Sequence, residues 1–161
     1  MRPARHVALA LAALLGLALL SGTLSVVPVA SSSMSPTVCP GDRVLLWTLG
    51  AGSRASAGDV VTLREPATGR GLLKRVVAVA GQTVEVVDGR LVVDGHPEDE
   101  SYVDLESVDG TFFGPVTVGS GSVFVLGDRR EHSIDSRDFG DVPRSAVTGV
   151  VLRQLTSRCP G

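Results

Sequence analysis

The sequence is poor in aromatic side chains, histidine and cysteine, and each shortage excludes something. One Trp, one Tyr and four Phe, against 19 Gly and nine Pro, favour short strands and turns over long helices. Three His and two Cys are scattered without ligand spacing, so we expect neither a metal site nor a cofactor. A net charge of −2 gives no electrostatic reason to expect nucleic acid as a partner.

The one long apolar run covers residues 7–30, which carry no charge and consist mostly of Ala, Leu and Val. A helix of this length can cross a hydrocarbon core of roughly 30 Å. Arg2 and Arg5 precede the run, so the positive-inside rule predicts a cytoplasmic N-terminus and an extracytoplasmic remainder. A cleavable secretory signal would look similar, but Pro28 fits poorly at the minus-three position of a cleavage site. We expect a retained single-pass anchor in the cell membrane over residues 1–30.

Strand signals dominate residues 31–161, and no window there has a helical period. Short apolar runs lie between turn residues, and the turns at 88–89 and 119–121 predict two hairpins. The expected strands are 42–47, 59–63, 72–80, 83–87, 90–93, 115–118, 122–126 and 146–155. The polar stretch 96–113 is expected to be a surface excursion. The predicted fold class is an all-β domain tethered by one N-terminal transmembrane helix.

Cys39 and Cys159 would lie in an oxidising compartment if this topology holds. A bridge between them would close a long loop, which stabilises a fold mainly by constraining the unfolded chain. The sequence does not show that the two are near each other. Disulfide and free thiols therefore both remain open.

Ser33 and Lys74 are the residues that point most directly to chemistry. A serine becomes a nucleophile at neutral pH when a base within hydrogen-bond reach accepts its proton. Ser33 follows the apolar run at once, and Pro36 restricts the backbone of Ser35 just after it. Lys74 lies in an apolar strand, where desolvation would lower its pKa. The plain alternatives are a flexible polar linker and a solvated strand lysine.

A third segment, residues 127–143, is rich in charge. Read alone it is a solvated loop. The spacing of Asp135 and Arg137 also allows a local ion pair that would hold the loop rigid. Ser133 could then offer its hydroxyl to a neighbouring catalytic group.

In order along the chain, these segments resemble the motifs of bacterial type I signal peptidases. The matching residues are Ser-x-Ser-Met-x-Pro-Thr at 31–37, Gly-Asp at 41–42, Gly-Asp-Val-Val at 58–61, Lys-Arg at 74–75, and the Gly-Asp-x-Arg-x-x-Ser-x-Asp-Ser-Arg motif that begins at Gly127. The resemblance implies a signal-peptidase-like β catalytic domain and a membrane-bound serine endopeptidase. Its expected reaction removes signal peptides from exported preproteins after small residues of the Ala-x-Ala type.

By this resemblance Ser33 is the nucleophile and Lys74 the general base, a Ser-Lys variant of the serine-protease logic. The Ser31 hydroxyl is the expected second oxyanion donor, beside the backbone N–H of Ser33. Ser133 is expected to hydrogen-bond and orient the lysine. The expected partners are preprotein signal peptides, membrane lipid and the secretion translocon.

The remaining expected roles are structural or concern the substrate. Asp135 and Arg137 are expected to form an ion pair behind the site. Met34, Pro36 and Val38 are expected to form part of the pocket for the small residues of the substrate.

Two features depart from the family pattern. Cys39-Pro40 stands where aliphatic residues are common, and Arg129, Glu131 and His132 stand where Asn, Asp and Asn are usual. The rival interpretations are a dedicated maturation peptidase of the same superfamily with a single substrate, such as a pilus or conjugation protein, and a catalytically silent anchored binding domain. Self-cleaving LexA-type repressors fit poorly, because they carry a DNA-binding head and lack an anchor.

Overall fold

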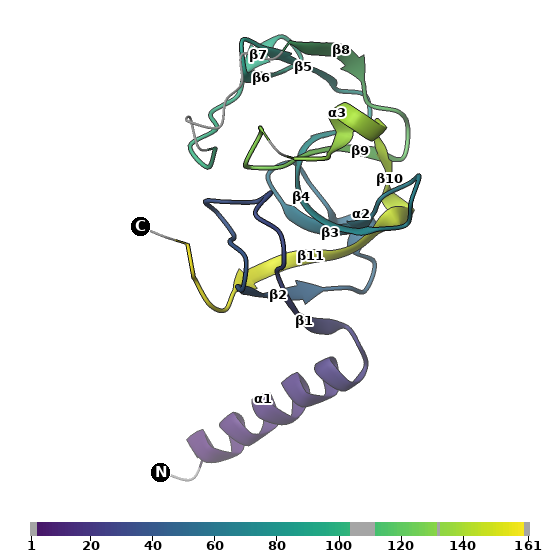
Figure 1. The fold of residues 1–161 in the computed structure, drawn as a ribbon. Helices are drawn as coiled ribbons and strands as arrows, with labels where there is room; N and C mark the ends of the chain where they lie inside the picture. The colour runs from purple at the N-terminus through teal and green to yellow at the C-terminus, as the bar shows by residue number, and fades with distance from the viewer. Residues whose placement is uncertain (1–2, 104–111, 132, 160–161) are drawn as a thin grey trace.

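The structure is a computed structural model that describes residues 3–103, 112–131 and 133–159. Two antiparallel sheets form its body (Figure 1). The large sheet has the order β1 (Leu24–Pro28), β2 (Arg43–Trp47), β11 (Val147–Gln154), β3 (Val60–Arg64), β4 (Gly71–Val79), β9 (Ser122–Leu126) and β10 (Val142–Pro143). The small sheet has the order β7 (His96–Pro97), β6 (Arg90–Val93), β5 (Thr83–Val87) and β8 (Phe113–Thr117). The mostly β fold class is confirmed.

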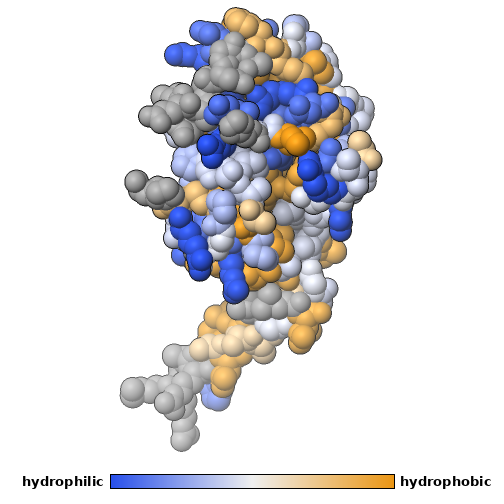
Figure 2. Space-filling model, viewed as in Figure 1, coloured by the Kyte–Doolittle hydropathy of each residue, from blue (hydrophilic) through white to orange (hydrophobic). Residues whose placement is uncertain are grey.

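Short helical turns join the strands. They are α2 (Ala51–Arg54), α3 (Ser136–Phe139) and the 3₁₀ helix η2 (Arg144–Ala146). The longer helix α1 (Pro3–Leu20) stands away from both sheets at the end remote from the small sheet (Figure 1). Apolar side chains cover the face of α1 in view, whereas polar and apolar residues are mixed over the body (Figure 2).

The apolar run divides between two kinds of element. The helix ends at Leu20, where the Ser21 N–H donates to Leu17 O at 2.9 Å, and Gly22 then adopts a φ of 71°. Residues 24–28 form β1, which pairs with β2 over its whole length. The helix thus ends earlier than the predicted anchor over 1–30, and the sheet takes in residues from its last part. Within the described ranges, none of the helices combines the length and apolar character that a membrane span requires.

Most of the predicted strands are present within a residue or two. The Asp88-Gly89 turn joins β5 to β6, with φ values of 51° and 74° that suit a primed hairpin turn. The second predicted hairpin is wrong: β8 pairs with β5 in the small sheet, while β9 pairs with β4 and β10 in the large one. In β9, Val123–Leu126 are buried in succession, which requires a strand covered on both faces. Part of the predicted excursion 96–113 forms β7 and the start of β8, and its residues 104–111 lie outside the described ranges.

Three apolar clusters hold these layers together. Phe124 and Leu126 of the large sheet pack against Val84 and Leu91 of the small one, so one cluster joins the two sheets. A second cluster fills the large sheet under α2 and around Val61. The third lies beneath β1 and β2 and includes residues 34 and 38 from the segment that carries Ser33. The cores therefore fix the positions of β4 and of the serine segment.

Cys39 and Cys159 form a disulfide. The bridge joins residues 120 positions apart and ties the end of the chain to the segment just after Ser33. The question that the sequence left open is thus answered in favour of the bridge.

Candidate active site

Ser33 and Lys74 meet at the edge of the large sheet. Ser33 lies in the turn region that follows β1, and Lys74 lies in β4, where it pairs with Val61 of β3. Lys74 Nζ donates a hydrogen bond to Ser33 Oγ at 2.8 Å. The lysine is only 2 % exposed, so its amine is almost entirely removed from water.

Burial changes the acidity of this lysine. Desolvation is the main cause that lowers the pKa of Lys74 from 10.5 to about 8. The positive charges of Arg70 and Arg137 lower it further, whereas the carboxylates of Asp135 and Asp128 oppose the change. With a pKa of about 8, roughly a tenth of the amine is uncharged at pH 7. An uncharged amine within hydrogen-bond distance of a hydroxyl can accept its proton.

Ser31 lies beside the pair. Its Oγ is 3.3 Å from Ser33 Oγ. A second hydroxyl is therefore within reach of any group that contacts the Ser33 side chain, as an oxyanion donor must be.

Two adjoining cavities lead to this pair. The smaller, about 240 Å³, is lined by Ser33 and Lys74, by Arg70 and by Ile134. The larger, about 510 Å³, runs between residues 25–30 on one side and β3 on the other. Ser31 and residues 71–73 line both cavities, which makes one continuous groove beside Ser33.

The groove exposes an open strand edge. β4 pairs with β3 along residues 71–75, but its pairing with β9 begins only at Arg75. Within the described ranges, residues 71–74 of β4 therefore have a strand on one side only. An extended peptide in the groove can add to this edge through backbone hydrogen bonds.

The predicted pocket residues lie elsewhere. Met34 and Val38 are 0 % and 2 % exposed and pack in the cluster beneath β1 and β2. Pro36 is exposed, and none of the three lines either cavity at Ser33. The turn after Ser33 directs the side chains of residues 34 and 38 into the core, and the groove is lined by β1, β3 and β4.

Ser133 is close to the pair without bonding to the lysine. It is 8 % exposed, and within the described ranges its Oγ has no hydrogen-bond partner, so the expected bond to Lys74 is absent from this arrangement. Gly127 separates Ser133 from Ser33: a Cβ at Gly127 would lie 2.6 Å from Ser133 Cβ and 2.7 Å from Ser33 O. Only a glycine allows this close approach.

Known proteins are similar to this chain in sequence and in fold. The family described as "Signal peptidase, peptidase S26" matches residues 4–155. The chain belongs to this family. Signal peptidase I of Leptolyngbya laminosa is 32 % identical over 128 residues, covering 74 % of this chain and 62 % of that protein. Signal peptidase I of Mycobacterium tuberculosis is 34 % identical over 155 residues, covering 66 % of this chain and 52 % of that protein. The chain thus spans about half to two thirds of the length of these relatives.

A solved structure agrees with the fold. The crystal structure of a signal peptidase I from Enterococcus faecalis superimposes with a TM-score of 0.53 at 30 % sequence identity. The match covers 60 % of this chain and 96 % of that chain. The large and small sheets described above are therefore a signal-peptidase-like fold.

The charged loop of this family member is built around Asp135. This carboxylate is fully buried, pairs with Arg137 at 2.9 Å, and accepts the Gly127 N–H at 3.0 Å. It also caps α3 through a reciprocal capping box with Asp138. Arg137 Nη2 in turn donates to Arg130 O at 2.6 Å. The ion pair is thus the centre of a rigid loop that faces Ser33.

Two further ion pairs, which join this loop to other elements, were not predicted. Arg75, next to Lys74, binds both carboxylate oxygens of Asp128 at 2.8 and 2.7 Å. Arg130 is 3 % exposed and pairs with Glu100, while its Nε donates to Gly127 O at 3.1 Å. The sequence signal was present in the charge of residues 127–137, but the partners come from β4 and from a loop far along the chain. These pairs hold the loop against β4 and against the segment that follows β7.

Proposed function

We propose that the chain is a membrane-bound serine endopeptidase that removes signal peptides from exported preproteins. The observation that carries the proposal is the 2.8 Å hydrogen bond between the amine of a buried lysine and the hydroxyl of Ser33. Family membership supports the substrate class, because the relatives are named for signal peptide processing.

In this proposal Lys74 takes the proton of Ser33 Oγ as that oxygen attacks the carbonyl carbon of the scissile bond. The tetrahedral oxyanion accepts hydrogen bonds from the Ser33 backbone N–H and the Ser31 hydroxyl. The protonated lysine then gives its proton to the leaving amine, and an ester on Ser33 remains. Lys74 next takes a proton from water, whose oxygen attacks the ester. Lys74 then returns the proton to Ser33 Oγ as the ester bond breaks, which releases the signal peptide with a free carboxylate.

The signal peptide binds in the groove as an added strand along residues 71–73 of β4. Small side chains at minus one and minus three of the substrate suit a strand that lies close to the backbone of β4. Ser133 turns toward Lys74 to orient it in the loaded enzyme, since its buried hydroxyl has no hydrogen-bond partner within the described ranges.

The site is held at the outer face of the cell membrane. The positive charges at Arg2 and Arg5 keep the N-terminus in the cytoplasm, and residues 7–30 connect it to the catalytic domain. Membrane lipid and the secretion translocon are the proposed partners on this side, because they deliver the precursor.

Precursor cleavage by the full chain in detergent micelles tests the proposal. We expect a precursor with Ala-x-Ala before the junction to be cut after the final Ala, about tenfold faster at pH 9 than at pH 7, because the neutral fraction of Lys74 rises through pH 8. Ser33→Ala and Lys74→Ala should each lower kcat by at least about a thousandfold. Ser32→Ala, a hydroxyl removed one residue away, is the matched control and should retain the rate.

The outcomes separate the rival interpretations. Retained cleavage in Lys74→Ala would refute the dyad. Cleavage of one precursor encoded beside this protein, and of none in a panel of unrelated precursors, would favour a dedicated maturation peptidase. No cleavage with either set would leave the silent binding domain.

A further inference from the structure

Residues 155–159 fold back over the segment that follows Ser33. We call residues 155–159 the C-terminal strap. The Leu155 N–H donates to Arg43 O at 2.7 Å, and the Arg43 N–H donates to Thr156 Oγ1 at 2.9 Å. The strap then ends at the disulfide with Cys39. It therefore extends the pairing of β11 and β2 beyond the end of the sheet.

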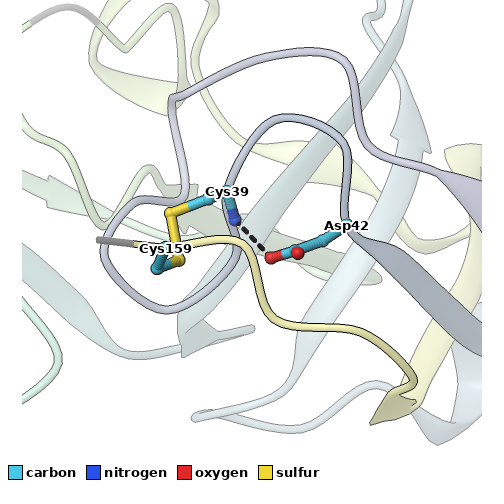
Figure 3. A group of neighbouring side chains, drawn as sticks. All are labelled: Cys39, Asp42 and Cys159. Carbon is cyan, nitrogen blue, oxygen red and sulfur yellow. Dashed lines mark hydrogen bonds between the residues drawn. A yellow bond between two sulfur atoms is a disulfide. The ribbon is translucent and has the colours of Figure 1, made fainter. Parts of the chain in front are cut away.

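Asp42 is the polar anchor of this strap. Its carboxylate is 0 % exposed and accepts three hydrogen bonds: from the Cys39 N–H at 2.8 Å, from Gln154 Nε2 at 2.7 Å and from the Arg158 N–H at 2.7 Å. Figure 3 shows the carboxylate turned toward the backbone of Cys39 beside the bridge. A buried carboxylate with three N–H donors fixes all three donor segments relative to one another.

These three side chains do not form a metal site in this state. The sulfur atoms of Cys39 and Cys159 and an oxygen of Asp42 lie within 4.8 Å of one another. Metal ligation requires thiolates, whereas these two sulfurs are bonded to each other. The role of the cluster is therefore structural: the disulfide and the Asp42 carboxylate hold the C-terminal strap against the segment that follows Ser33.

A short segment of chain connects the disulfide and Asp42 to Ser33. Between Ser33 and Cys39 the chain makes one tight turn, in which the Val38 N–H donates to Met34 O at 2.8 Å. The side chains of residues 34 and 38 hold this turn in the core from one side. The bridge and Asp42 hold its other end, and Ser33 O accepts the Arg129 N–H at 3.1 Å.

We propose that Cys39, Cys159 and Asp42 are positioning residues for Ser33, so that the oxidised bridge sets the reactivity of the nucleophile. The inference rests on the proposed peptidase function. Opening the bridge frees the end of the turn, and Ser33 Oγ then no longer stays 2.8 Å from Lys74 Nζ. Displacements of about 1 Å in such a pair cost about a hundredfold in rate. The groove along β4 is not touched by the strap, so peptide binding is preserved.

Reduction of the full chain in micelles tests this. A dithiol such as dithiothreitol supplies two electrons and two protons to the sulfur–sulfur bond, giving two thiols and the cyclic disulfide of the reagent. We expect kcat for precursor cleavage to fall at least about tenfold while KM stays within about twofold. The acid limb of the pH profile should not move, because the burial of Lys74 is unchanged. Reoxidation should restore kcat in the native chain but not in the Cys159→Ser variant.

Two controls separate positioning from general stability. Circular dichroism at the assay temperature measures the folded fraction of the reduced chain. Val93→Ala removes buried volume in the small sheet and lowers the unfolding temperature without touching the strap. A large loss of kcat in folded, reduced protein, with kcat preserved in Val93→Ala, supports the inference.

Other outcomes overturn it. An unchanged kcat after reduction, or a loss that only tracks the unfolded fraction, would show that the bridge serves stability alone. An oxidised wild-type chain that cleaves no precursor would instead refute the proposed function.

Discussion

Lys74 gives up hydration that a surface lysine keeps. Its ammonium form is disfavoured by burial, and the pKa of Lys74 of about 8 measures that penalty. The two carboxylates that act on it only partly offset the loss. Below pH 8 the folded protein therefore holds a charged amine in a place that suits a neutral one.

Lys74→Met should make the protein inactive and more stable. The native chain loses the lysine proton near pH 8 when folded but near 10.5 when unfolded, so its stability rises with pH between these values. The variant lacks this penalty, and we expect it to be about 3 kcal/mol more stable than the native chain at pH 7. The difference should shrink to below about 1 kcal/mol at pH 10. Urea unfolding at the two pH values measures it.

Leu72→Met, on the same strand, is the control. It keeps Lys74, so its difference in stability from the native chain should be the same at pH 7 and at pH 10. Equal stabilities of the native chain and the Lys74→Met variant at pH 7 would contradict a desolvation penalty on the charged amine of Lys74.

At the level of single residues, the sequence predicted that Ser33 and Lys74 lie together better than it predicted their surroundings. Ser33 and Lys74 stand out because local chemistry marks them: a serine before a rigid proline, and a lysine among apolar neighbours. The burial of Met34 and Val38 in a core cluster could not be read from the sequence, because an apolar side chain suits a pocket and a core equally well. The partner of a buried hydroxyl such as that of Ser133 depends on a rotamer, which no sequence pattern encodes.

The turn between β3 and β4 carries a charge to the groove. Arg70 lines the cavity of Ser33 and Lys74, and its guanidinium pairs with Glu65 at 3.3 Å. About half of the Arg70 side chain is exposed, so its removal should leave the fold intact. The positive charge nevertheless lowers the pKa of Lys74.

Arg70→Gln should move the pH profile of cleavage. Without the guanidinium the pKa of Lys74 rises, less amine is neutral at a given pH, and the acid limb of kcat/KM shifts upward by a fraction of a pH unit. The shift should shrink at high salt, because salt screens the repulsion between Arg70 and Lys74. Arg90→Gln, on β6, is the matched charge control and should leave the profile in place. A shift to lower pH in Arg70→Gln would contradict the electrostatic account.

At the level of elements, strands were easier to predict than their partners. Alternation and turn residues marked β2 to β6 because these are local signals. The pairing of β8 and β9 was predicted wrongly, since a Gly-Ser-Gly turn serves a crossover between sheets as well as a hairpin. β1 was hidden in the apolar run, where a strand covered by lipid or core and the end of a helix have the same composition.

On the scale of the whole molecule, α1 is separate from the body. Figure 1 shows it extending away from the sheets, and six of its large apolar side chains are exposed. These are Val7, Leu9, Leu11, Leu14, Leu17 and Leu20, with exposed fractions from 59 % to 88 %. An exposed apolar surface of this kind marks an interaction site, and the proposed membrane location would cover it.

A chain limited to residues 21–161 should keep the fold and the site. Among the side chains that the structure describes, those of α1 belong to none of the apolar clusters of the sheets, so we expect its unfolding temperature to stay within about 2 °C of the full chain. It should cut a short soluble peptide at the full rate but lose its advantage on precursors embedded in lipid vesicles. A fall of tens of degrees would instead show that α1 is part of the folding unit.

β1 also acts as a spacer of fixed length. It follows α1 almost immediately, and five residues at about 3.3 Å each span roughly 17 Å before the chain turns toward Ser33. Its ladder to β2 stiffens that distance, so the nucleophile cannot rise or sink as it would on a loose tether. With α1 in the bilayer, Ser33 would reach the scissile bond of a precursor only at a fixed distance from the lipid surface. Precursors would then be sorted by how far their junction protrudes as well as by the side chains that flank it.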